Sequence, residues 1–177
     1  MIVYSLTNET LQVALDAAPK FANRNDWNLM SGPIGEWAAI KYLTDNGQRL
    51  HTPGGDRHDL EIYLPHSQVD VEVKTRSAGR TPPRSDSFVS APARRVFRQS
   101  AESDLFIFAW RWIDGHQHLV ALVGWEYARQ VRRWPLKEKG TRWADADDVV
   151  KYDVLRQQIS QLRPLDELIE KLDDETL

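Results

Sequence analysis

Two short stretches near the middle of the chain alternate polar and apolar residues. Residues 59–63 (DLEIY) and 68–75 (QVDVEVKT) both repeat with a period of two, and residues 64–67 between them include a proline. This period is typical of half-buried β-strands, because successive side chains of a strand point to opposite faces of the sheet. We therefore predict a β-hairpin with a four-residue loop at 64–67, the register that places each apolar residue opposite another.

The two faces of this hairpin differ in chemistry. One face is apolar and consists of Leu60, Ile62, Val69, Val71 and Val73. The other carries Asp59, Glu61, Asp70, Glu72 and Lys74. The register pairs Asp59 with Glu72, and Glu61 with Asp70, with Cβ atoms about 4.5–5.5 Å apart. Opposed carboxylates repel each other unless a cation lies between them, which indicates a divalent metal site. The alternative is an outer sheet face that is charged for solubility.

A helix is predicted before the hairpin. The sequence SGP at 31–33 is a favourable helix start, because proline suits the first turn, and Gly47 marks the end of the helix. Glu36 lies four and seven residues before Ile40 and Leu43, so its carboxylate shares their face of the helix. We expect Glu36 to point inward. Alternatively, its negative charge interacts favourably with the free backbone N–H groups near the N-terminus of the helix.

Hydrophobic spacing predicts the other elements of the chain. Thr7 is suited to cap a helix over 7–22, and Ser90 is suited to cap another over 91–101. The apolar run LFIFAW at 105–110 predicts a central strand that is buried on both faces. The remaining predictions are strands at 48–52 and 118–125, a helix at 126–133, and a C-terminal helical extension over about 145–172 that includes a helix opening at Pro164.

The length and composition restrict the class of protein. A chain of 177 residues suits one domain, here 1–177 with a core at about 32–125. It has no cysteine, which excludes disulfides, thiolate metal sites and cysteine nucleophiles. No stretch approaches the roughly 20 apolar residues that span a bilayer. The N-terminus also lacks the pattern of a secretory signal. We therefore expect no membrane contact and a cytoplasmic location.

Positive charge follows the hairpin, although the formal net charge of the chain is −3. A loop predicted at 75–85 and the exposed side of the 91–101 helix carry six candidate nucleic-acid-binding residues, Arg76, Arg80, Arg84, Arg94, Arg95 and Arg98. Arginines of this kind neutralise phosphates. The alternative is a solvated loop and helix face. A second basic stretch at 132–143 contains Trp134 and Trp143, which we expect to pack on the domain rather than to stack on bases.

Four features stand in order along the chain. They are Gly35-Glu36 on the predicted helix, Gly54-Gly55 after a short strand, Asp59 at the start of the hairpin, and Glu72-Val73-Lys74 on its second strand. This ordered set resembles the PD-(D/E)XK nuclease superfamily, with His58 in place of the motif's proline, over about residues 32–125. The resemblance implies an α/β fold with a restriction-endonuclease-like core. In that core a central mixed β-sheet is flanked by helices (αβββαβ), here with N- and C-terminal helical additions.

The resemblance also implies a chemistry. Asp59, Glu72 and the backbone carbonyl of Val73 would bind Mg²⁺, for which Mn²⁺ can substitute, and oxygen ligands suit both cations. Glu36 would be an outer ligand or would help to bind a second metal. Lys74 would orient the attacking water or stabilise negative charge on phosphorus. The expected protein is a metal-dependent deoxyribonuclease with DNA as partner. A homodimer fits as well, because members of the superfamily often dimerise.

Other interpretations stay open at this point. A catalytically inactive module on the same fold would bind nucleic acid or assemble with other proteins. Asp56 competes with Asp59 for the metal, although its glycine-rich setting is typical of a turn. We expect Glu61 and Asp70 to be solvated, and we leave His116 and His118 out of the site because histidines in a turn or at a strand edge are more often plain surface residues.

Overall fold

A computed structural model describes residues 1–16, 31–53, 58–99, 103–142 and 153–177. The strands are β1 (Ile2–Leu6), β2 (Arg49–His51), β3 (Leu60–Tyr63), β4 (Gln68–Ser77), β5 (Phe88–Pro92), β6 (Leu105–Asp114), β7 (Gln117–Tyr127), β8 (Leu136–Lys137) and β9 (Val154–Gln158). The helices are α1 (Asn8–Asp16), α2 (Ser31–Asp45), α3 (Ala93–Gln99), α4 (Ala128–Val131), a 3₁₀ turn η1 (Ile159–Gln161) and α5 (Leu165–Asp173).

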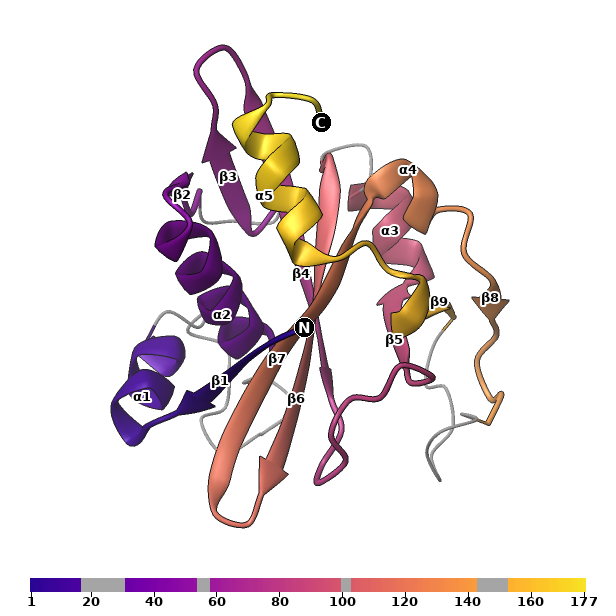
Figure 1. Cartoon of the computed structure of the whole chain (residues 1–177). Helices are drawn as coiled ribbons and strands as arrows, with labels where there is room; N and C mark the ends of the chain where they lie inside the picture. Colours follow the sequence, from indigo (N-terminus) through magenta and orange to yellow (C-terminus); the bar gives the residue numbers. More distant parts are fainter. Residues whose placement is uncertain (17–30, 54–57, 100–102, 143–152) are drawn as a thin grey trace.

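The fold is mixed α/β and is built on two sheets (Figure 1). The large sheet has six strands in the order β1-β7-β6-β4-β3-β2, and the small sheet has three in the order β5-β9-β8. In the large sheet β4 and β6 are parallel, and every other neighbouring pair is antiparallel. The large sheet is therefore a mixed sheet, as predicted.

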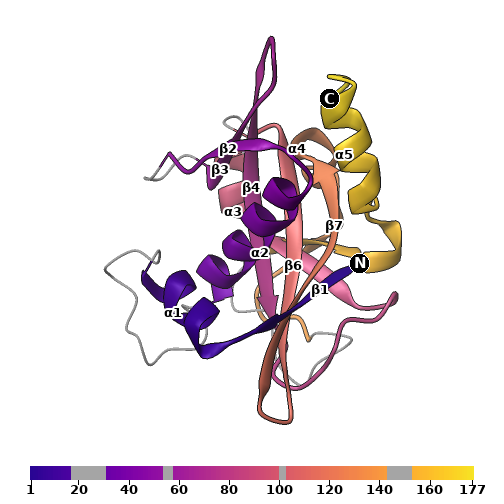
Figure 2. The ribbon, with the colours of Figure 1, turned by 60° about the vertical axis from the view of Figure 1, so that its left-hand side comes forward.

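Hydrophobic cores cover both faces of the large sheet. On one face Ile34 and Leu43 of α2 pack with the apolar residues of the β3–β4 hairpin, and Figure 2 shows α2 lying across this face. On the other face Phe106 and Phe108 of β6 pack with Val89 of β5 and with residues of β9 and α4. Since β6 contributes to both cores, its first eight residues are all buried. The prediction of a central strand buried on both faces is confirmed.

The hairpin prediction is also confirmed, with one change. Glu61 pairs with Asp70, and the Leu64 N–H donates to the Ser67 carbonyl at 3.0 Å across the four-residue loop. The five residues of the predicted apolar face are all buried. The ladder ends at the pair of Leu60 with Val71, however, and the predicted pairing of Asp59 with Glu72 is not part of it. The Asp59 N–H instead donates to the Val71 carbonyl at 3.0 Å, so Asp59 is offset along the strand.

Helix α2 begins and ends where the sequence predicts, and Gly47 beyond it has a positive φ of 81°. Gly35 lets this helix approach β4 very closely. A Cβ atom on Gly35 would lie 1.8 Å from Thr75 Oγ1 and 3.2 Å from the Ala109 Cβ. Only a residue without a side chain fits here, because no Cβ atom tolerates such contacts. The close approach brings Glu36, the next residue, up to strand β4.

The predicted helix over 91–101 is present as α3, but it begins only at Ala93. Ser90 does not cap it, because Ser90 lies in β5 and pairs with Arg156 of β9. The prediction of a helix is wrong for one segment of the C-terminal part. Residues 154–158 of the expected C-terminal helical extension form β9. Segments of five residues carry too little periodicity to separate helix from strand, and here hydrogen bonds to a distant strand decide. The final helix, α5, follows Pro164 as expected.

Other boundaries shift as well. Thr7 caps α1, since its Oγ1 accepts from the Thr10 N–H at 3.2 Å, while residues 17–22 of the predicted helix lie outside the described part of the chain. The predicted helix at 126–133 shortens to α4, because β7 continues to Tyr127. Strand β1 was not predicted. Its residues are mostly exposed and it gains its structure by pairing with β7.

We predict that Gly35→Ala lowers the free energy of unfolding by about 1–3 kcal/mol, because the added methyl group forces α2 away from β4. Gly32→Ala is the matched control in the same helix, since its Cβ would meet Glu36 Oε1 at an ordinary 3.7 Å. That substitution should change stability by less than about 0.5 kcal/mol. Urea unfolding followed by circular dichroism measures both, and equal stability of the two variants would contradict the close contact.

Candidate active site

Side chains from distant parts of the sequence converge on one open cleft with a volume of ≈ 1030 Å³. One wall is formed by the start of α2, with Glu36, and by the hairpin, with Asp59, Glu72 and Lys74. The other wall is formed by α3 and by the segment around β8. The structure thus brings together all four predicted catalytic residues, and Val73 lines the same cleft.

Glu72 is the most deeply placed of these side chains. It is only 2% exposed, on a strand in the interior of the large sheet. An ionised carboxylate at such a position is costly unless it is paired. The ammonium group of Lys74, two residues further along β4, donates a hydrogen bond to Glu72 Oε1. Lys74 is itself largely buried and therefore provides the compensating charge inside the cleft.

Asp59 is held by the backbone of β4. Its Oδ2 accepts a hydrogen bond from the Val73 N–H at 2.7 Å. Strand β3 begins only at Leu60, so the side chain of Asp59 serves as the partner of Val73 where the ladder of the hairpin has ended. This bond fixes the Asp59 carboxylate beside the residue that follows Glu72, although the two acids are not paired in the ladder.

Glu36 completes the acidic wall from α2. Burial and, to a smaller extent, the negative charges of Asp59 and Glu72 together raise the pKa of its carboxyl group to about 7, although Lys74 acts in the opposite direction. Glu36 therefore shares an electrostatic environment with the other three residues. Its prediction as an inward-pointing acid is supported, and near neutral pH it exchanges a proton easily.

The acidic wall fits a divalent cation in charge and in ligand type. Three carboxylates and one ammonium leave two negative charges when all four groups are ionised. Carboxylate and carbonyl oxygens are the ligands that Mg²⁺ and Mn²⁺ prefer. The ligand oxygens of Glu36, Asp59 and Glu72 do not all lie within 4.8 Å of one another in the described structure. This spread is compatible with two inner ligands and one outer ligand.

A second cluster lies further toward the turn of the hairpin. His58 Nε2 is 3.0 Å from Glu61 Oε1 and 3.7 Å from Asp70 Oδ1. The Tyr63 hydroxyl donates to Glu61 Oε2 at 3.0 Å. The side chains of His58, Glu61 and Asp70 are 7%, 15% and 27% exposed. Glu61 and Asp70 thus keep some contact with solvent, as expected, but they also belong to a cluster with His58 that was not expected. The hydrogen bond from His58 lowers the pKa of Glu61.

This imidazole and these two carboxylates could hold a metal ion, because their ligand atoms lie within 4.8 Å of one another. Sequence reasoning missed the cluster, since it treated His58 only as a replacement for the motif's proline. The signal was present, because His58 precedes Glu61 by three residues and the predicted register sets Glu61 opposite Asp70. What the register alone cannot give is the direction in which the imidazole points.

The six candidate arginines fall into different environments. Arg76 lies in β4 rather than in a loop, stacks 4.6 Å from the Trp110 ring centroid and donates to the Phe88 carbonyl. Arg80 and Arg84 are exposed, and Arg84 pairs with Asp86 at 3.2 Å. Arg94 lines the cleft, whereas the side chains of Arg95 and Arg98 lie outside the described part of the structure. Of the described arginine side chains in this set, Arg94 alone reaches the cleft.

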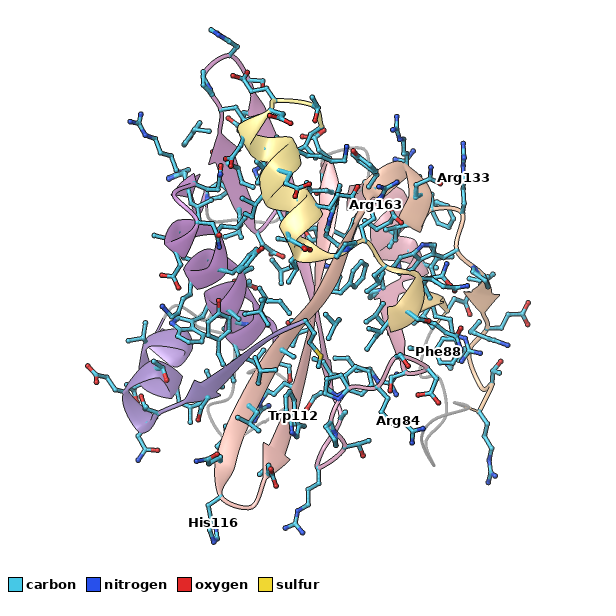
Figure 3. The ribbon with its side chains drawn as sticks, in the orientation of Figure 1. Arg84, Phe88, Trp112, His116, Arg133 and Arg163 are labelled. Atoms are coloured by element: carbon cyan, nitrogen blue, oxygen red, sulfur yellow. The ribbon has the colours of Figure 1, made fainter. Side chains whose placement is uncertain are left out.

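Other expected features lie apart from the cleft or outside the described residues. Figure 3 shows His116 at the tip of the β6–β7 hairpin, at the opposite end of the large sheet from the β3–β4 turn. Trp134 packs on Phe108 with ring centroids 5.0 Å apart, as predicted for a tryptophan of the domain core. Trp143, Gly54, Gly55 and Asp56 lie outside the described residues, so the rival ligand Asp56 is not placed.

Comparison with known proteins adds no family assignment. No protein-family model matches the chain, and no curated protein shows significant sequence similarity to it.

Among the described residues, no helix combines the length and the apolar character needed to cross a membrane. Function therefore has to be inferred from the chemistry of the cleft.

We predict that the raised pKa of Glu36 makes stability depend on pH. The ordinary pKa of 4.5 rises to about 7 in the fold, so between these values the folded protein binds more protons than the unfolded chain. The free energy of unfolding therefore falls as the pH rises through this window, by about 3 kcal/mol in total. Urea unfolding at pH 5 and pH 8 in EDTA should show this loss in the wild type, whereas Glu36→Gln should lack that part of the pH dependence. Equal pH profiles would contradict the buried position of Glu36.

Proposed function

We propose that this protein is a divalent-metal-dependent nuclease that hydrolyses DNA phosphodiester bonds. The observation that carries the proposal is the convergence of Glu36, Asp59, Glu72 and Lys74 on one cleft. An acidic wall with a single ammonium group is the arrangement expected where a metal ion and a negatively charged phosphate meet. Acids on a solvated surface would show neither the burial of Glu72 nor the raised pKa of Glu36, so these residues are not ordinary surface charges.

The order of the elements supports a restriction-endonuclease-like core as part of this proposal. Helix α2 is followed by β2, β3 and β4, then by α3 and by β6, which lies parallel to β4. This order of helices and strands corresponds to the αβββαβ order that the resemblance implies, with β5 inserted before α3. In this order Glu36 lies on the first helix, Asp59 directly before the second strand, and Glu72 and Lys74 on the third strand, which supports the proposal.

In the proposed mechanism, Asp59, Glu72 and the Val73 carbonyl would hold Mg²⁺ or Mn²⁺. When bound, the cation offsets the charge of the phosphate and makes a neighbouring water more acidic. Lys74 is held at the cleft wall by Glu72, and its remaining N–H groups can donate to a phosphate oxygen or orient the attacking water. Glu36, with a pKa of about 7, is suited to accept a proton near neutral pH.

We predict that the purified protein with Mg²⁺ cleaves DNA, and that Glu72→Gln and Lys74→Ala each lower the rate at least about 100-fold. Glu72→Gln weakens the binding of the cation, and Lys74→Ala removes the ammonium group that stabilises charge at the phosphate. The assay should include linear, supercoiled, branched and single-stranded substrates. Lys41→Ala is the matched control, since Lys41 is exposed on α2 and pairs only with Asp45 among the described ion pairs. Circular dichroism checks that each variant is folded.

Two results would count against the assignment. Unchanged cleavage in both active-site variants would mean that other residues carry the activity. DNA binding that persists in EDTA, with no hydrolysis in any divalent metal, would favour the inactive binding module instead. A protein that neither binds nor cleaves DNA would exclude both of these functions.

We predict that the divalent cation binds at the acidic wall rather than at the His58 cluster. In isothermal titration with Mg²⁺ or Mn²⁺, the double variant Asp59→Asn/Glu72→Gln should lose binding. The double variant Glu61→Gln/Asp70→Asn changes the same number of charges on the same face of the hairpin and should retain it. The reverse result would place the metal at His58, Glu61 and Asp70 and would overturn the assignment of the catalytic ligands.

A further inference from the structure

The wall of the cleft opposite the acids carries two exposed apolar side chains. Phe97 on α3 is 59% exposed and Leu136 on β8 is 50% exposed, and both line the cleft. Single apolar residues on a surface need no explanation. Here, however, two apolar residues line one cleft that also contains three carboxylates. They provide a flat ring and an aliphatic group that a ligand in the cleft would contact.

Positive charge accompanies these apolar groups. Arg94 precedes Phe97 by three residues on α3, so the two side chains are neighbours on one face of the helix. Both line the cleft, as does Lys139 on the segment after β8. The Asp153 carboxylate, which also lines it, accepts from the backbone N–H of Lys139 at 2.9 Å and leaves the lysine ammonium to other partners. This wall therefore combines an aromatic ring with cations.

An aromatic ring flanked by cations is suited to an unpaired nucleotide. The base stacks on the ring and the cations contact the phosphates on either side of it. Intact duplex DNA presents phosphates and sugars at its surface and keeps the faces of its bases covered. It could satisfy Arg94 and Lys139, but it would leave Phe97 without a partner. The complementarity of this wall is therefore greater for single-stranded than for paired DNA.

We propose that the cleft takes DNA with an unpaired base next to the phosphodiester bond that is cut, and that Phe97 stacks on this base. The inference rests on the proposed nuclease function, since the acidic wall supplies the reacting site. It adds the substrate class, single-stranded or locally unpaired DNA, and it gives Phe97 the role of a residue that determines specificity.

The test measures binding separately from hydrolysis. Fluorescence anisotropy with the Glu72→Gln protein compares a labelled single-stranded oligonucleotide with a blunt duplex of the same sequence. We expect at least tenfold tighter binding of the single strand. Adding Phe97→Ala should weaken that binding roughly tenfold, as the loss of one stacking ring does, with little effect on the duplex. Phe97→Trp should restore the preference, because indole also stacks on bases.

Val13→Ala is the control for loss of exposed apolar surface, since Val13 is 53% exposed on α1 and does not line the cleft. It should leave both affinities unchanged. Equal affinity for the two DNA forms would overturn the inference, as would a Phe97→Ala variant that binds single strands like its parent.

Failure of the inference can be distinguished from failure of the proposed function. If the wild type cleaves blunt duplex as fast as single strands in Mg²⁺ and Glu72→Gln abolishes both activities, the result supports the nuclease function and contradicts the preference for an unpaired base. If no DNA is cleaved but a Phe97-dependent preference for single strands persists, the result supports the role of Phe97 in binding and contradicts the nuclease function. If the protein neither cleaves DNA nor prefers single strands, both the nuclease function and the role of Phe97 in binding DNA are overturned.

Discussion

The ion pair between Glu72 and Lys74 is the constraint on which the cleft depends. Strand β4 lies inside the large sheet, with β3 on one side and β6 on the other, and there a charged carboxylate is tolerated only with a partner. Lys74 supplies that partner from the same face of the same strand. Asp59 and Glu36 then add negative charge that a single ammonium does not balance. Burial, together with the charges of Asp59 and Glu72, raises the pKa of Glu36. Perturbed pKa values of this kind are concentrated at functional sites, in agreement with the proposed site for a cation and a phosphate.

Packing on both faces of the sheet maintains this arrangement. Gly35 allows α2 to lie directly against Thr75, which brings Glu36 to the edge of β4. The early end of the hairpin ladder leaves the Val73 N–H to the carboxylate of Asp59. On the far side of the cleft, the small sheet and α3 provide a wall of different chemistry, which Phe97 and Arg94 line. The cleft is thus acidic on one side and both cationic and aromatic on the other.

The hairpin also carries acids that are not part of the proposed catalytic set, and their environment differs. Glu61 and Asp70 are opposed in the ladder, but His58 lies between them and binds Glu61 through a hydrogen bond. An imidazole thus bridges this pair of acids, whereas the set of Glu36, Asp59 and Glu72 is accompanied by the ammonium group of Lys74. The two groups of acids therefore differ in the chemistry of the partner that lies beside them.

Local features of this protein could be predicted from its sequence. Alternation over 59–75 was sufficient for the hairpin and for its register as far as the pair of Leu60 with Val71, but not for the position of Asp59. The spacing of Glu36, Ile40 and Leu43 was sufficient for an inward acid, because periodicity reflects which side chains a single element can bury. The sequence could not supply β5 and β9, whose strands are short and exist through pairing over more than 60 residues. Nor could it show that Arg76 packs on Trp110, that His58 lies near Asp70, or that Phe97 lines the same cleft as the acids. These relations arise from contacts between segments that are far apart in the chain, which no local pattern in the sequence encodes.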